Sequence, residues 1–132
     1  MSTIKAKIKT IEKEGDLSLL SFVSKSQELT MISLELHPDI TQETEVLLRV
    51  KATNIAIAKE FSGVLSYANQ LKVRIVSIKM GSLLCMLTLD FEERRLESVI
   101  TAASAKKMQL QINDRVTALI KASDLSIAEI YS

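Results

Sequence analysis

The chain has 132 residues, of which 47% are hydrophobic and 25% charged, and its formal net charge is +1. This near-neutral charge argues against a dedicated nucleic-acid surface, which is typically strongly basic. The single cysteine excludes an intrachain disulfide and suits a reducing compartment. The start of the chain is not typical of a signal peptide, and no stretch has the length of a transmembrane helix. We therefore expect a cytoplasmic protein without membrane contact.

The first half of the sequence predicts strands. Ile4 to Ile8 alternates apolar and polar residues, the period of a half-buried strand, and Gly15 marks the turn that follows. Pro38 ends a later strand because proline cannot donate a hydrogen bond to a ladder. The strands predicted after Gly15 cover 17–23, 29–36, 46–51 and 55–58.

The second half repeats this order and adds a helix. Alternating apolar residues predict a strand at 83–91, and the charged segment 92–95 predicts a hairpin turn. Helix-forming residues at 102–110 follow Thr101, a suitable N-cap. The other strands of this half are predicted at 71–80, 96–101, 116–120 and 125–129.

An internal repeat connects the two halves. Lys51-Ala52-Thr53-Asn54-Ile55-Ala56-Ile57-Ala58 aligns without a gap to Lys121-Ala122-Ser123-Asp124-Leu125-Ser126-Ile127-Ala128. A repeated segment indicates a repeated structural unit. Five strands with one late helix is the outline of an OB-type barrel. We predict a mainly β protein with two tandem five-stranded OB-type barrels, at 1–63 and 64–132, and one short helix in the second.

Three motifs of the second unit carry a family resemblance. They are Ser66-Tyr67-Ala68-Asn69, Thr101-Ala102-Ala103-Ser104 and Lys121-Ala122-Ser123. With this spacing the chain resembles the Mop (TOBE) family, and the fused pair of units resembles the di-Mop proteins. The resemblance implies binding of molybdate or tungstate, without a further cofactor or a direct protein–metal ligand, at interfaces between units. The implied oxyanion-binding residues are Ser66, Asn69, Thr101, Ser104, Lys121 and Ser123, and a second candidate site contains Lys51 and Thr53.

The chemistry of these residues suits a tetrahedral dianion. Hydroxyl groups can rotate a hydrogen toward any oxygen, and Lys121 supplies positive charge. The amides of Ala102 to Ser104 are expected to face the anion at a helix N-terminus.

One departure from the family pattern weakens this cage. Ala68 stands where the family motif has arginine, so a guanidinium and up to two parallel hydrogen bonds are absent. At about 1.5–3 kcal/mol for a charge-assisted bond, the affinity falls by roughly one to two orders of magnitude unless another basic residue replaces it. Lys72 and Arg74 are the candidates. The first unit has Ser33-Leu34-Glu35-Leu36 at the Thr-x-x-Ser position, so we expect fewer sites than in a symmetric di-Mop protein.

Other reactive residues have simpler interpretations. Ser104 and Lys107 form a Ser-x-x-Lys motif, but the companion motifs of serine acylases are absent. His37 stands alone in a turn, without neighbours that could complete a metal site. Cys85 alternates with leucines, which is typical of a core residue. We therefore expect no enzymatic activity.

Leu84 and Met86 make the outer face of their strand apolar. A small barrel has one interior, so this face is expected to meet another unit or subunit. By analogy with the di-Mop proteins we favour a homotrimer, with a dimer as the second choice.

The main functional hypothesis is passive binding of molybdate or tungstate for storage, buffering or sensing. The alternative is an oligomer-forming structural or regulatory module with a weakened or lost oxyanion site, either the effector part of a molybdate-responsive regulator or a transporter accessory domain. The sequence carries no helix-turn-helix segment, and an OB-type nucleic-acid binder would need aromatic stacking platforms. No direct nucleic-acid binding is therefore expected. The two anions have nearly the same size and charge, so the sequence does not separate them.

Overall fold

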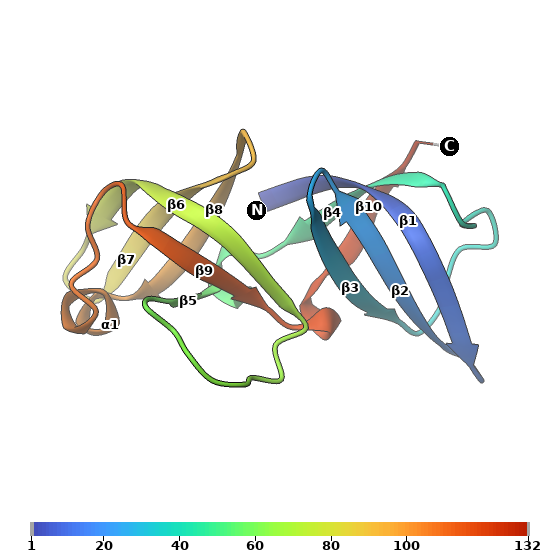
Figure 1. Cartoon of the computed structure of the whole chain (residues 1–132), viewed down its shortest axis with the longest axis horizontal. Coiled ribbons are helices and arrows are strands. Elements are labelled where there is room, and N and C mark those ends of the chain that lie inside the picture. Colours follow the sequence, from blue (N-terminus) through green and yellow to red (C-terminus); the bar gives the residue numbers. More distant parts are fainter. Residues whose placement is uncertain (1, 132) are drawn as a thin grey trace.

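The computed structural model describes residues 2–131 and contains two five-stranded, curled sheets, A and B, whose buried residues form one connected hydrophobic cluster (Figure 1). Sheet A has the order β10-β4-β1-β2-β3, with β1 at Ser2–Glu14, β2 at Leu17–Ser24, β3 at Gln27–Ser33, β4 at Glu45–Val50 and β10 at Ser126–Ile130. Sheet B has the order β5-β9-β6-β7-β8, with β5 at Ala56–Ala58, β6 at Asn69–Met80, β7 at Leu84–Phe91, β8 at Arg94–Thr101 and β9 at Arg115–Ile120. One short helix, α1 at Ala102–Lys107, follows β8. The predicted fold class is confirmed. No helix in residues 2–131 is long and apolar enough to cross a membrane.

The alternation of β7 places its side chains as predicted. Cys85, Leu87 and Leu89 are fully buried, whereas Leu84 and Met86 on the opposite face are 58% and 38% exposed. The hairpin to β8 turns at Glu92 and Glu93, which have positive φ angles of 47° and 73°. Two consecutive positive φ angles are the signature of a type I′ turn, which matches the twist of the flanking strands. The hairpin forms with glutamates in place of the usual Asn-Gly.

Two predicted elements are shorter than expected. Helix α1 ends at Lys107 and not at Leu110, because Gln109 adopts a left-handed φ of 52°. The amides of Gln109 and Leu110 then donate to the carbonyls of Lys106 and Ala105, a Schellman cap. Strand β3 ends at Ser33 and not at Leu36, where its pairing with β2 ends opposite Ser18.

Each sheet takes its fifth strand from the other half of the sequence. Strand β4 leads through a 3₁₀ turn, η1 (Ala52–Asn54), into β5, which pairs with β9 in sheet B. Strand β9 leads through the equivalent turn η2 (Ala122–Asp124) into β10, which pairs with β4 in sheet A. In Figure 1 the green β5 lies in the left-hand sheet and the red β10 in the right-hand sheet. The sequence units 1–63 and 64–132 therefore do not coincide with the two sheets.

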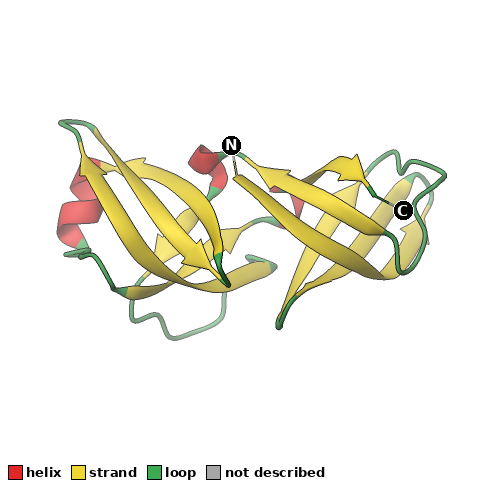
Figure 2. Cartoon of the chain, turned by 90° about the horizontal axis from the view of Figure 1, so that it is seen from above, coloured by secondary structure: helices red, strands yellow, loops and turns green. Residues whose placement is uncertain are grey.

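The two exchanged connections run antiparallel past each other in one register. Arg49 pairs with Ser126 in sheet A, and Ala56 pairs with Leu119 in sheet B. The second pair lies seven residues along both strands from the first, so the register is the same on either side of the junction. Figure 2 shows the sheets end to end with short helical turns between them. The turns η1 and η2 lie between these two ladders.

Side-chain amides bridge the two sheets beside these connections. The Asn69 amide accepts a hydrogen bond from Thr30 N at 2.7 Å and donates one to Thr30 O at 2.9 Å. The Gln27 amide does the same for Lys72, accepting from its N at 3.0 Å and donating to its O at 3.4 Å. β3 and the start of β6 are thus held in an antiparallel arrangement through side chains.

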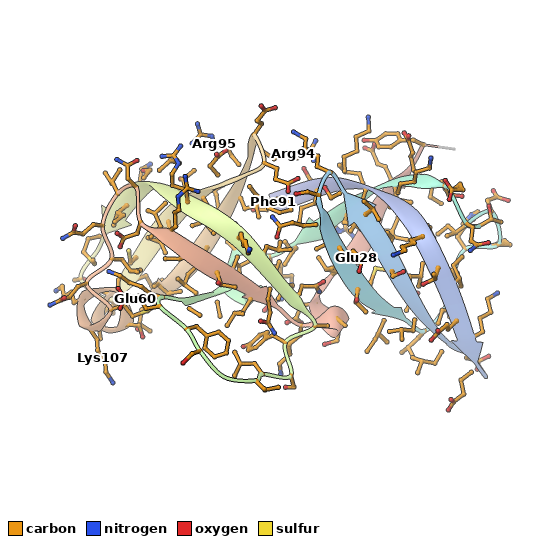
Figure 3. All side chains as sticks on the ribbon, viewed as in Figure 1. Glu28, Glu60, Phe91, Arg94, Arg95 and Lys107 are labelled. Atoms are coloured by element: carbon orange, nitrogen blue, oxygen red, sulfur yellow. The ribbon has the colours of Figure 1, made fainter. Side chains whose placement is uncertain are left out.

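The β2–β3 turn also contacts the hairpin between β7 and β8. The Ser26 hydroxyl donates to the Glu92 carboxylate, and Lys25 Nζ donates to Glu92 O at 2.7 Å. Arg94 Nη1 donates to Thr3 O at 3.2 Å, and Figure 3 shows Arg94 where the sheets meet. Polar contacts therefore join the sheets at three places besides the connections: β3 with β6, the β2–β3 turn with the β7–β8 hairpin, and the start of β1 with β8.

Candidate oxyanion-binding site

The strand exchange brings together residues from both sequence units. Lys51 of the first unit and Ser123 of the second line one pocket of about 380 Å³ at the junction of the sheets. The sequence analysis grouped Lys51 with Thr53 and Lys121 with Ser123. The structure pairs them crosswise because Lys51 follows β4, Ser123 precedes β10, and these two strands are neighbours. We call this the junction pocket; it is lined by Arg49, Val50, Lys51, Asn54, Ser123, Asp124, Leu125 and Ser126.

The junction pocket is rich in hydrogen-bond donors and has a positive balance. Arg49 and Lys51 supply two cations against the one carboxylate of Asp124. No ion pair joins either cation to a carboxylate within residues 2–131. Arg49 Nε donates to Ser126 Oγ at 3.3 Å. The hydroxyls of Ser123 and Ser126 and the amide of Asn54 complete the polar lining.

The backbone around the pocket has the same local geometry in both units. Lys51 and Lys121 are extended residues that precede the turns η1 and η2. In each case the lysine carbonyl accepts from the amide three residues later, Asn54 N at 2.9 Å and Asp124 N at 3.0 Å. The aligned segments therefore fold alike, and both lysine side chains are exposed.

Thr101 and Ser104 meet at the start of α1. Thr101 Oγ1 accepts from Ser104 N at 3.1 Å and donates to Ser104 Oγ at 2.8 Å, so the predicted N-cap is confirmed. Both side chains are exposed, and neither lines the junction pocket. The amide of Ala102 donates to Leu83 O at 2.8 Å. Two of the three amides expected to face an anion, those of Ala102 and Ser104, are thus already engaged.

Asn69 is placed differently from the sequence expectation. Its side chain is fully buried, and its amide oxygen and nitrogen both bond to the main chain of Thr30. The reason is that the start of β6 faces the edge strand β3, and the amide joins the two. Ser66 is exposed in the loop 59–68, as are Thr53 in η1 and Lys121. The structure of one chain therefore brings together Lys51 with Ser123, and Thr101 with Ser104.

Sequence reasoning missed four polar residues of the junction pocket. Asn54, Asp124 and Ser126 lie within the aligned repeat, and Arg49 lies two residues before it. Arg49 is an exposed position of the alternating strand β4, so it shares a face with Lys51. The sequence does not show which strands are neighbours, because the repeat does not reveal that β5 and β10 are exchanged between the sheets.

The other reactive residues, His37 and Cys85, have structural roles. The His37 Nδ1 atom accepts from Asp39 N at 3.1 Å within an exposed turn. Burial raises the pKa of the Cys85 thiol, which keeps it in the neutral form of a core residue. Within residues 2–131, no cluster of three His, Cys, Asp or Glu side chains is arranged to hold a metal ion.

Comparison with known proteins agrees with the fold and the motifs. The TOBE domain family model matches residues 65–127. The molybdenum import ATP-binding proteins ModC of Brucella abortus (strain 2308) and Brucella suis biovar 1 (strain 1330) are each 34% identical over 92 residues, which cover 69% of this chain but only 26% of each relative. The chain thus spans about a quarter of the length of these relatives.

Among solved structures, the cytoplasmic molybdate-binding protein ModG with molybdate bound has the same fold. It superposes with a TM-score of 0.88 at 19% identity, covering 95% of this chain and 93% of ModG. Residues 65–127 therefore form a TOBE domain, and the whole chain has the fold of ModG.

Proposed function

We propose that the protein binds a tetrahedral oxyanion, molybdate or tungstate, passively in the cytoplasm, for storage, buffering or sensing. The observation that carries this proposal is the junction pocket, which gathers two unpaired cations with hydroxyl and amide donors. An anion that offers only oxygen acceptors needs such converging donors. The similarity to ModG, described as a cytoplasmic molybdate-binding protein, supports the proposal.

A second binding region would lie on the surface and need a second copy of the chain. Lys121, Thr101, Ser104 and Ser66 are exposed, and none of them lines the junction pocket. A cage made from them is completed by donors of another subunit. The first unit does not cover Leu84 and Met86. These two exposed side chains give an apolar surface for such an assembly. We favour a homotrimer, with a dimer as the second choice. In either assembly Asn69 acts by holding the start of β6 and not by contacting the anion.

Thermal unfolding with and without anions tests the proposal. Millimolar molybdate or tungstate should raise the unfolding temperature by several degrees, because a ligand at 100 times its Kd stabilises the folded state by about 2.7 kcal/mol. Sulfate and phosphate serve as competing oxyanions. The double variant Lys121→Ala/Thr101→Ala removes the surface region, and Lys51→Ala removes one junction cation. Lys106→Ala, an exposed lysine of α1, is the matched control. A folded protein that none of the four anions stabilises would refute the proposal.

The alternative is a structural or regulatory module in which the oxyanion site is weakened. Ala68 in place of arginine favours it, as does the Asp124 carboxylate inside the pocket, which repels an anion. This alternative predicts an oligomeric, well-folded protein whose unfolding temperature does not respond to any of the four anions. The similarity to ModC, a transporter ATPase, keeps a role as a transporter accessory domain within this second class.

A further inference from the structure

We propose that Arg49 supplies, from β4, the guanidinium that is missing at position 68, and that the junction pocket thereby binds one oxyanion within a single chain. This inference rests on the proposed function and assigns its within-chain site. The first sequence expectation for a replacement was Lys72 or Arg74. Neither lines the junction pocket, and both line a separate groove between sheet B and the β2–β3 turn of sheet A.

Only the first of the two aligned segments has an arginine two residues before its lysine. In the alignment of the two units, Arg49 corresponds to Leu119, which is only 5% exposed. The repeat therefore does not account for an arginine at this position. Lys51 and Lys121 precede the equivalent turns η1 and η2, and Asn54 and Asp124 end them, so the junction has two similar halves. Of the two lysines, only Lys51 has a guanidinium two residues before it on the same strand face, and only Lys51 lines the junction pocket.

The contacts of Arg49 leave its binding groups available. Nε donates to Ser126 Oγ at 3.3 Å, which orients the guanidinium along the neighbouring strand β10. Neither Nη group has a hydrogen-bond or ion-pair partner within residues 2–131. A planar guanidinium donates two parallel hydrogen bonds to an oxyanion, whereas Lys51 acts as a point charge. These are the two kinds of cation that the family pattern combines at its site.

Asp124 reduces the net positive charge of the junction pocket. The pocket holds two cations and one carboxylate, so an entering dianion is attracted by Arg49 and Lys51 and repelled by Asp124. The corresponding residue of the first unit is Asn54, which is uncharged. Replacing Asp124 by asparagine therefore makes the two units alike at this position and removes the repulsion without changing the size of the side chain.

The test is a direct binding measurement with molybdate, by isothermal titration calorimetry, on the full chain and four variants. Arg49→Leu should weaken binding roughly 10- to 100-fold, the loss of a charge-assisted contact. Arg49→Lys should recover part of the loss, and Asp124→Asn should bind tighter than the parent chain. Arg115→Leu removes an exposed arginine outside the pocket and is the matched control. It should bind like the parent chain.

The outcomes separate the inference from the proposed function. If the parent chain does not bind molybdate or tungstate, both fail. If it binds, and Arg49→Leu and Asp124→Asn both leave the affinity unchanged, the anion lies elsewhere and only the inference is overturned. Loss of binding in Arg49→Leu and in Arg115→Leu to the same degree would also overturn it, because that result indicates general charge attraction. Arg49 is exposed, and unfolding scans without anion show whether each variant is folded.

Discussion

Asn69 and Gln27 replace main-chain pairing between two strands that belong to different sheets. Strand β6 pairs with β7 only from Arg74 onward, so the free edge of its first residues faces β3. The two amides span this gap, each bonded to both the N–H and the C=O of one residue, Thr30 or Lys72. A buried main-chain group must find a partner. Asn69 is fully buried and Gln27 is half-buried, so water can replace the hydrogen bonds of Gln27 more easily than those of Asn69.

We expect Asn69→Leu to destabilise the protein by about 2–3 kcal/mol, because it leaves the N–H and C=O of Thr30 buried without partners. Gln27→Leu should cost less, since water can reach the main chain of Lys72. Urea denaturation gives both values from the midpoints and slopes. Equal effects of the two substitutions would contradict the role of burial at Asn69.

At this scale the sequence predicted residue types better than residue contacts. Thr101 was predicted as an N-cap from its position before a run of helix formers, and a cap depends only on residues within one turn. The partner of Asn69 is Thr30, which lies 39 residues away. No local pattern reports such a contact, so the family motif was the only available guide to Asn69, and it indicated a ligand role.

Among the elements, the β7–β8 hairpin shows how a turn can depend on a distant segment. Glu92 and Glu93 hold left-handed backbone angles that favour Asn and Gly. Burial acts to raise the pKa of the Glu92 carboxyl, but hydrogen bonds from the hydroxyl and amide of Ser26 and from Gln27 outweigh it and lower the pKa. The turn of sheet A thus stabilises the charged form of a turn residue in sheet B.

This lowered pKa predicts a pH dependence. Glu92 stabilises the fold fully above its ordinary value of 4.5, and its contribution is lost as the pH falls through the lower folded-state value. In Glu92→Gln the free energy of unfolding should therefore fall less than in the parent chain between pH 6 and pH 3, read from urea denaturation at each pH. The more exposed Glu93→Gln is the control and should follow the parent curve more closely. A parent-like acid dependence in Glu92→Gln would contradict the assignment.

Most elements were predictable because their patterns are local. The alternation of Cys85, Leu87 and Leu89 defined β7 and its buried face. The ends were less predictable, because they depend on partners. β3 stops where its pairing with β2 ends at Ser33, and α1 stops shortly before Gln109 turns left-handed.

At the scale of the whole molecule, the exchange of β5 and β10 was not predictable from the repeat. A segment that closes its own sheet and a segment that closes its neighbour's sheet carry the same apolar alternation. The structure shows why exchange occurs, since the register of β4 with β10 continues through η1 and η2 into that of β5 with β9. At each of the two connections, the chain passes straight from one sheet into the other without reversing its direction.

The exchange predicts that a cut in the loop between the units will not separate them. A protease site inserted between Gly63 and Val64 lies in an exposed loop, where Val64 is 99% exposed. After cleavage the two fragments should co-elute in gel filtration and part only in denaturant, because each contains a strand of the other's sheet. The uncut insertion variant is the control. Fragments that elute separately without denaturant would contradict the exchange.

The positions of the two chain ends determine how the fold resists a force that pulls them apart. β1 and β10 flank β4 on its two sides, with Ser2 beside Val50 at one end of β4 and Ile130 beside Val46 at the other. A force that pulls the two termini apart therefore slides β1 and β10 along β4 in opposite directions. All hydrogen bonds of both ladders are loaded together in shear, instead of opening one after another like a zip. Because β9 leads through η2 directly into β10, a pull on the C-terminus also loads sheet B through β9.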